Sequence, residues 1–192
     1  AEMGGKNACI VTADGDLDRA ALGIMRSAFG LSGQKCSALS RVYVEESVAD
    51  EFLAKLKPVV DAIRVGDPTQ AENYIGPVVT AEGYANFQSF TKQLSDSDTT
   101  MITGGHSLTD GAMRNGYFCA PTVAEAPLDN PLWKKEMFAP IVMIARVPDK
   151  ETDMALSNDT DLGLTAGFYG NPEETAWFFD NIEAGVTYAN RP

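Results

Sequence analysis

Cys36 is the residue of this sequence best suited to covalent chemistry. It stands within Gly33–Ser37 (GQKCS), and a cysteine thiolate is a strong nucleophile. Gly30 and Gly33 give the backbone freedom to approach a substrate closely and to begin a new helix near Gln34. Cys36 would then lie in the first turn of that helix, where free N–H groups attract an anion and can stabilise an oxyanion. The alternative that residue type alone favours is a small, buried core cysteine.

Composition and charge argue against several other classes of protein. The 192 residues carry a formal net charge of −12, and a nucleic-acid partner would require a basic surface. Three widely spaced cysteines and a single histidine, His106, argue against a metal site or a disulfide framework. No apolar run approaches the roughly 18 residues that cross a bilayer, and no signal-peptide pattern is present. We therefore expect a cytoplasmic protein without a metal or a membrane partner.

The elements that must position Cys36 alternate between strands and helices. Apolar, β-branched runs predict strands at residues 7–12, 41–45, 101–103, 117–123, 141–147, 164–169 and 186–189. Helical periodicity predicts helices that follow Asp16 to residue 29 and span 47–63, 80–94, 149–157 and 172–181, with Asp16 and Ser47 as N-caps. This alternation predicts an α/β domain with a doubly wound, mainly parallel sheet flanked by helices. The helix-poor region 101–147 is expected to hold a hairpin or an extended excursion.

Five short motifs, in order along the chain, resemble signatures of the aldehyde dehydrogenase superfamily. They are Glu2–Asn7 (EMGGKN), Gly33–Arg41 (GQKCSALSR), Glu136–Pro140 (EMFAP), Asn158–Leu164 (NDTDLGL) and Gly185–Arg191 (GVTYANR). Ala139 stands where the third signature usually has glycine, which is a mild departure. The resemblance implies that residues 1–192 are the nucleophile-bearing catalytic domain of such an enzyme. The N-terminal dinucleotide-binding domain and a C-terminal tail are then expected to lie outside this sequence.

The resemblance also implies a role for individual residues. Cys36 would be the nucleophile that forms a thiohemiacetal and then a thioester, and Glu2 the general base that activates the hydrolytic water. Glu136 would hold the ribose on the nicotinamide side, with Phe138 packed beside it. Ser37 would contact the substrate. Without the motifs, Glu2 and Glu136 would be solvated carboxylates, Phe138 a core aromatic, and Ser37 a turn residue bonded to its own backbone.

Other polar and titratable residues are interpreted as structural. Lys6 is expected to be structural, Lys35 to be a surface cation, and His106 to lie in a loop without a role. Cys9 and Cys119 are expected to be buried core thiols.

The activity that the resemblance implies is NAD(P)-dependent oxidation of an aldehyde to a carboxylate, with NAD, or alternatively NADP, as cofactor. The segment 33–38 (GQKCSA) is most similar to the branch that oxidises 1-pyrroline-5-carboxylate, as glutamate γ-semialdehyde, in proline catabolism. Alternatives are a dehydrogenase for succinate or aminoadipate semialdehyde, acyl transfer to coenzyme A, and a non-catalytic binding or structural relative. The parent protein is expected to be a homo-oligomer, and the 192 residues alone to have negligible turnover.

Overall fold

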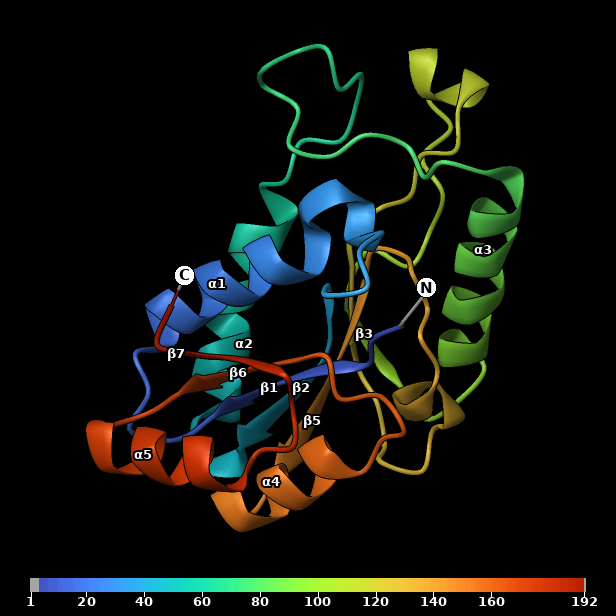
Figure 1. Cartoon of the computed structure of the whole chain (residues 1–192). Helices are drawn as coiled ribbons and strands as arrows, with labels where there is room; N and C mark the ends of the chain where they lie inside the picture. The colour runs from blue at the N-terminus through green and yellow to red at the C-terminus, as the bar shows by residue number, and fades with distance from the viewer. Residues whose placement is uncertain (1–3, 192) are drawn as a thin grey trace.

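A seven-stranded sheet forms the centre of the part of the protein that the computed structural model describes, residues 4–191 (Figure 1). Its strands are β1 (Asn7–Val11), β2 (Leu39–Glu45), β3 (Thr100–Thr103), β4 (Thr122–Glu125), β5 (Ile141–Val147), β6 (Thr165–Tyr169) and β7 (Val186–Ala189). Their order across the sheet is β3-β4-β5-β2-β1-β6-β7. Neighbours are parallel except for the antiparallel pair β3 and β4. The predicted fold class is confirmed. In the region 101–147, where a hairpin or an extended excursion was expected, β3 and β4 form an antiparallel pair joined by the long connection 104–121.

Helices cover both faces of the sheet, as expected of a doubly wound domain (Figure 1). One face is covered by α1 (Leu17–Phe29) and α2 (Glu46–Asp61). The opposite face is covered by α3 (Ala81–Ser95), α4 (Lys150–Asn158) and α5 (Pro172–Asn181). None of the helices within residues 4–191 is long and apolar enough to cross a membrane.

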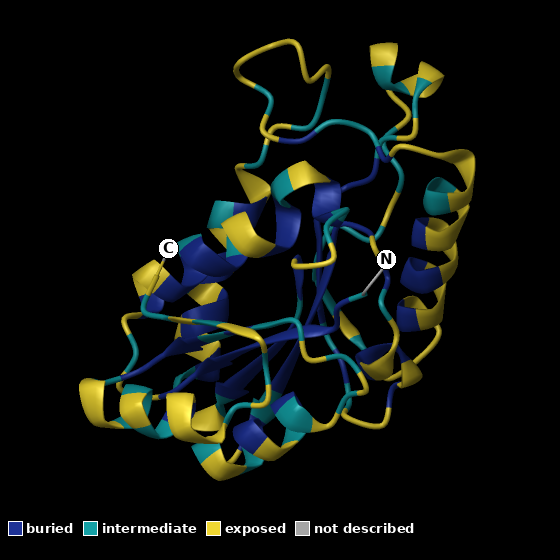
Figure 2. Ribbon diagram, in the orientation of Figure 1, coloured by how far each residue is buried: buried dark blue, intermediate teal, exposed yellow. Residues whose placement is uncertain are grey.

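β1 is buried on both faces because it lies near the middle of the sheet. Cys9 and Val11 pack toward α1 and α2, whereas Ala8 and Ile10 pack toward the opposite layer. Figure 2 shows the buried sheet between helices whose outer surfaces are exposed. A strand enclosed in this way is apolar throughout rather than alternating, which explains the continuous run that predicted it. The expectation that Cys9 is a core thiol is confirmed, and Cys119 is buried as well.

The N-terminus of α2 differs from the prediction. The helix begins at Glu46, and its N-cap is Glu45, whose side chain forms no capping hydrogen bond. Ser47 is therefore not the cap, because it already lies within the first turn. The predicted N-cap Asp16 of α1 is confirmed, since its side chain accepts a hydrogen bond from the Arg19 N–H.

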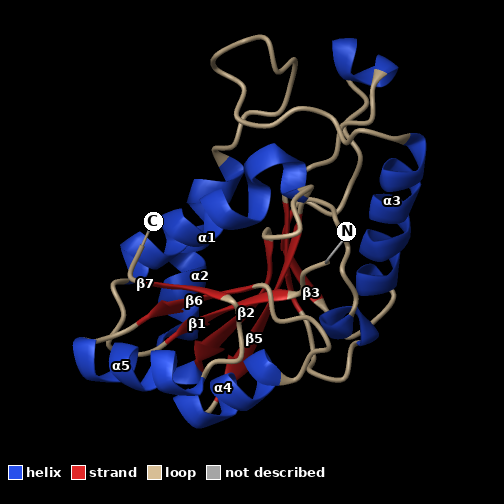
Figure 3. Ribbon diagram, viewed as in Figure 1, coloured by secondary structure: helices blue, strands red, loops and turns tan. Residues whose placement is uncertain are grey.

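The predicted strand at 117–123 is also largely wrong, because only residues 122–125 form β4. Pro121 has no N–H to contribute to a ladder. The residues before it turn toward a neighbouring loop, where the Ala120 N–H donates to the His106 carbonyl. Figure 3 shows the two long connections, residues 62–80 and 104–121, extending from the same end of the sheet. The Val78 N–H joins them by donating to the Tyr117 carbonyl.

Candidate active site

Cys36 lies in a turn and not in a helix. The Ala38 N–H donates to the Lys35 carbonyl over 3.0 Å, so Cys36 and Ser37 are the two central residues of the turn, and both are exposed. The prediction of a helix that begins near Gln34 is wrong, because the chain passes from this turn directly into β2. The alternative of a buried core cysteine is wrong as well. The candidate nucleophile is therefore presented on a short connection immediately before β2.

The three thiols are expected to differ sharply in reactivity. Burial raises the pKa of Cys119 to about 12, and burial together with the charge of Asp153 raises the pKa of Cys9, whereas Cys36 is exposed. Iodoacetamide at pH 8 should therefore label Cys36 at least about 10²-fold faster than Cys9 or Cys119 in the native protein. Peptide mass spectrometry measures the three rates, and denaturation should remove the difference. Comparable labelling rates for the three cysteines in the native protein would contradict the assignment of Cys36 as the reactive thiol.

The upstream side of the turn is held by two distant loops. The Gln34 side chain accepts a hydrogen bond from the Val79 N–H (2.9 Å) and donates one to the Leu31 carbonyl (3.1 Å). Gly33 has a φ of +70°, and a Cβ atom there would lie 2.3 Å from the carbonyl oxygen of Ala139. The signature around Cys36 and the signature that contains Ala139 are therefore in direct backbone contact.

Replacing Gly33 by alanine should lower the free energy of unfolding by about 3 kcal/mol or more, because the substitution adds a backbone clash to an unfavourable φ. Gly111 supplies a matched control, since its φ is +56° and a Cβ atom would meet nothing within 4 Å. Gly111→Ala should cost only about 1 kcal/mol. Urea denaturation followed by tryptophan fluorescence measures both values, and equal losses would show that the contact with Ala139 contributes nothing.

The downstream side of the turn is held by the beginning of β1. The side-chain nitrogen of Asn7 donates to the carbonyls of Cys36 (2.8 Å) and Ala38 (2.7 Å), and its oxygen accepts from the Thr165 N–H (3.0 Å). The Cys36 carbonyl also lies against Gly5, where a Cβ atom would be 1.8 Å from the carbonyl oxygen. Motif reasoning gave Asn7 no role, although a polar residue at the start of a buried strand was a signal that could have found it.

The Gly5 backbone connects Glu136 to Cys36. The Glu136 carboxylate is half-buried and accepts a hydrogen bond from the Gly5 N–H (3.1 Å), so the Gly5 backbone contacts both candidate residues. Phe138 is 49% exposed and has a φ of +49°, which is uncommon for a bulky residue. Phe138 is therefore not a core aromatic, and Glu136 is not a freely solvated charge.

A buried cationic pair lies beneath this site. Lys6 is fully buried, and its amine has no hydrogen-bond partner among the described residues. Burial, reinforced by the charge of Arg41, lowers the pKa of Lys6 to about 7, although Glu136 opposes the shift. The Arg41 guanidinium donates to the Lys6 carbonyl (2.8 Å) and to the carbonyls of Leu156 and Ser157 at the end of α4. The pair joins β1, β2 and α4.

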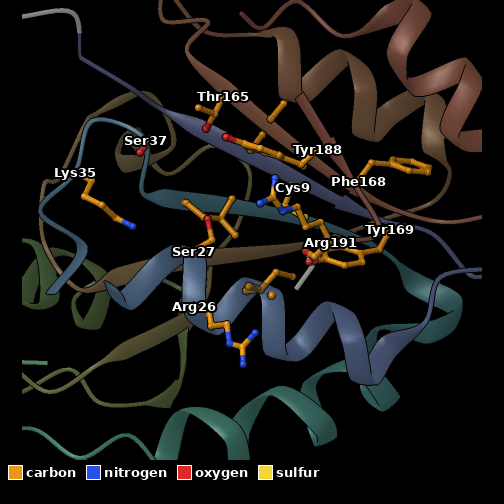
Figure 4. Close-up of a pocket in the computed structure, with 16 residues that line it drawn as sticks. Cys9, Arg26, Ser27, Lys35, Ser37, Thr165, Phe168, Tyr169, Tyr188 and Arg191 are labelled. Atoms are coloured by element: carbon orange, nitrogen blue, oxygen red, sulfur yellow. Dashed lines mark hydrogen bonds between the residues drawn. The ribbon is translucent and has the colours of Figure 1, made fainter. Parts of the chain in front are cut away.

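A cavity of about 310 Å³ opens beside the turn, between α1 and strands β1 and β6 (Figure 4). Ser37 and Lys35 lie at one end of it, so Lys35 is not simply a surface cation. Arg26 and Arg191 also line the cavity, whereas none of its sixteen described lining residues is acidic. In a chain with a net charge of −12, this cavity is suited to an anionic group.

Glu2 lies outside the described residues, so its assignment as the general base stays a prediction. His106 is exposed, and among the described residues its imidazole ring is hydrogen-bonded only to the Gly104 carbonyl. Across residues 4–191, no group of three or more His, Cys, Asp or Glu side chains is arranged to hold a metal ion.

Known proteins are similar to this chain over all or most of its length. The model of the aldehyde dehydrogenase family matches residues 1–192. The 1-pyrroline-5-carboxylate dehydrogenase 1 of Halalkalibacterium halodurans is 37% identical over 165 residues, 85% of this chain and 31% of the relative. The alpha-ketoglutaric semialdehyde dehydrogenase of Bacillus subtilis is 31% identical over 98% of this chain and 39% of the relative.

Solved structures are similar over nearly the whole chain as well. A 1-pyrroline-5-carboxylate dehydrogenase from Thermus with bound NAD has a TM-score of 0.91 and 34% identity, covering 98% of this chain and 36% of that one. PnpE from a Pseudomonas species has a TM-score of 0.94 and 31% identity, with 98% and 39% covered. The chain thus spans between about 30% and 40% of the length of the proteins that it matches.

Proposed function

Because the chain belongs to the aldehyde dehydrogenase family, we propose that it is the nucleophile-bearing domain of a longer enzyme that oxidises an aldehyde to a carboxylate with NAD. The proposal rests mainly on the placement of Cys36. This exposed cysteine is held at the tip of a turn by backbone contacts with two other family signatures. Such a fixed, accessible thiol is what covalent capture of a carbonyl requires.

The geometry of the turn supports a proposal for the first chemical step. The Cys36 thiolate adds to the aldehyde carbonyl and forms a thiohemiacetal with a developing oxyanion. No acceptor for the Cys36 N–H is found within residues 4–191, so this N–H remains able to donate to that oxyanion. Bound NAD supplies the hydride acceptor, and a thioester on Cys36 is left behind.

Glu136 and Phe138 have the chemistry expected of a contact with the nicotinamide-side ribose. The half-buried Glu136 carboxylate offers acceptor oxygens for hydroxyl groups, and the exposed ring of Phe138 offers an apolar wall two residues away. NADP would make the same contacts at this end of the dinucleotide. Glu2 is proposed to remove a proton from the water that hydrolyses the thioester, a contribution of roughly 10²–10⁴-fold.

The proposed substrate is glutamate γ-semialdehyde, the open form of 1-pyrroline-5-carboxylate, whose oxidation yields glutamate in proline catabolism. Several relatives carry the name 1-pyrroline-5-carboxylate dehydrogenase. The cavity beside Ser37, lined by Arg26, Lys35 and Arg191 and free of acidic lining residues in its described part, suits a substrate that bears a carboxylate. The alpha-ketoglutaric semialdehyde dehydrogenase relative favours a second candidate, another semialdehyde that bears a carboxylate. We further propose a cytoplasmic homo-oligomer.

A substrate panel with the full-length parent protein tests this proposal. NADH formation is measured with glutamate γ-semialdehyde, succinate semialdehyde, alpha-ketoglutaric semialdehyde and hexanal. We expect kcat/KM for glutamate γ-semialdehyde to exceed that for hexanal by at least about 10²-fold, because a buried or partly desolvated carboxylate contact discriminates strongly against an uncharged chain. A preference for hexanal would contradict the substrate proposal. The 192-residue chain alone should give no measurable turnover.

A further inference from the structure

We infer that Asn7 is a positioning residue for the nucleophile, acting through the backbone of Cys36 and not through contact with the substrate. This inference rests on the proposed function, because it assigns Asn7 a part in the chemistry of Cys36. Its evidence is the set of hydrogen bonds that Asn7 makes and the irregular pairing of β1 with β2 at this point.

The ladder between β1 and β2 is irregular where the turn begins. Asn7 is paired with Leu39, but Ala8 is paired with Arg41, so Ser40 is skipped. An extra residue of this kind disrupts the ladder locally and bends the strand. The carbonyls of Cys36 and Ala38 lie just upstream of this irregularity, outside the hydrogen-bonded pairing of β1 with β2. The side chain of Asn7 supplies the donors that the ladder does not provide.

The orientation of Asn7 is fixed by three partners. Its side chain is almost entirely buried, and its residue exposure is 3%. Both amide hydrogens are used, one for each carbonyl, and the oxygen accepts from the Thr165 N–H on β6. A flipped amide would place an oxygen against two carbonyls and an NH₂ group against an N–H, so the partners themselves determine the orientation.

Fixing the Cys36 carbonyl fixes the direction of the nucleophile. Gly5 leaves no space beside that carbonyl oxygen, so the oxygen is confined between the Gly5 backbone and the Asn7 amide. The position of this peptide group determines one of the two backbone torsions of Cys36. The directions of the Cys36 N–H and of its side chain depend on that torsion, and a displacement of about 1 Å is enough to slow an oriented reaction by roughly 10²-fold.

Two reactions of the Cys36 thiol distinguish a change in its orientation from a loss of its intrinsic reactivity. Acylation by p-nitrophenyl acetate forms a bond between Cys36 Sγ and the acetyl carbon, breaks the ester C–O bond and releases p-nitrophenolate. It passes through an oxyanion that the Cys36 N–H stabilises. Alkylation by iodoacetamide forms a C–S bond and releases iodide without any oxyanion. Loss of positioning should therefore slow acylation selectively.

The experiment uses the full-length parent protein with Asn7→Asp, which keeps an acceptor for the Thr165 N–H and removes both donors. Asn158→Asp is the matched control. Asn158 likewise donates to one backbone carbonyl, that of Asn181, and accepts from one backbone N–H, that of Glu183, each over 2.9 Å, without contacting Cys36. Circular dichroism checks that each variant folds. If Asn7→Asp does not fold, Asn7→Ser, which retains one donor, takes its place.

We expect Asn7→Asp to lower the acylation rate of Cys36 by at least about tenfold while alkylation stays within about threefold of the wild-type rate. Asn158→Asp should change neither rate by more than about twofold. Unchanged acylation in the folded Asn7 variant would overturn the inference, and so would equal losses of acylation and alkylation. A parent protein that shows the expected acylation ratio but oxidises no aldehyde would contradict the proposed function and leave the positioning role supported.

Discussion

Replacement of Cys36 by alanine is expected to lower NAD-linked aldehyde oxidation by the full-length protein by roughly 10⁴-fold or more, because no covalent intermediate can form without the thiol. Cys36 is the exposed cysteine of the described structure, and its turn is held by Gln34 on one side and Asn7 on the other. The rate of NADH formation with glutamate γ-semialdehyde measures the loss.

Cys119→Ala is the control for this substitution. Cys119 is also a free thiol, but it is 2% exposed and packs in the core that contains Phe87 and Phe90. Its replacement should lower the free energy of unfolding by about 1 kcal/mol and leave turnover nearly unchanged. Residual activity above one tenth in Cys36→Ala would rule out Cys36 as the nucleophile.

The second large effect is expected at Asp153, on α4. This side chain is fully buried, and neither of its oxygens has a hydrogen-bond partner within residues 4–191. Burial, with smaller contributions from the charges of Glu45 and Asp149, raises the pKa of Asp153 from 3.8 to about 8. The folded protein therefore holds this carboxyl protonated at pH values where the unfolded chain has released the proton.

The sign of the pH dependence follows from that difference in bound protons. Between pH 4 and pH 8 the folded state binds one proton more than the unfolded state at this site, so the contribution of Asp153 to stability falls as pH rises, by up to about 1.4 kcal/mol per pH unit. Asp153→Asn removes the titration and keeps the shape. The variant should nearly match the wild type at pH 4 and exceed its free energy of unfolding by about 5 kcal/mol at pH 8.

Urea denaturation of the wild type and the variant at pH 5, 6, 7 and 8 measures this difference. Asp67→Asn is the control, because Asp67 is exposed, its pKa is lowered by hydrogen bonds from Thr69, and its charge is not among those that act on Asp153. Its carboxylate is ionised in both states above pH 5, so the difference between Asp67→Asn and wild type should stay constant with pH. A constant difference for Asp153→Asn as well would show that Asp153 titrates normally.

Local patterns predicted the elements that local interactions determine. β5, α5 and β7 have the bounds that the sequence predicted. For α5 the reason lies within four residues, since Asn171 and Glu174 form a capping box around Pro172. β5 is apolar except for Arg146, because the strand is buried on both faces over most of its length.

The conformation around Cys36 could not be predicted in this way, because distant residues determine it. Glycines and free N–H groups suggested a helix, but the turn is fixed by Asn7, 29 residues away, and by Ala139. The motifs likewise identified Glu136 and Cys36 as candidate site residues, but they did not indicate which residue connects the two in space. That link is the Gly5 backbone, which lies 131 residues from Glu136 along the sequence.

The anchoring of Asn7 to β6 has a consequence for biosynthesis. The Thr165 N–H that fixes the Asn7 amide lies 158 residues further along the chain, so the contact forms only after those 158 residues have been synthesised. At translation rates of about 5–20 residues per second, that interval is roughly ten seconds or more. Parallel pairing between strands so far apart in sequence is also intrinsically slow. A nascent chain therefore carries Cys36 without this anchor, as a thiol open to oxidation, at least until Thr165 has been synthesised.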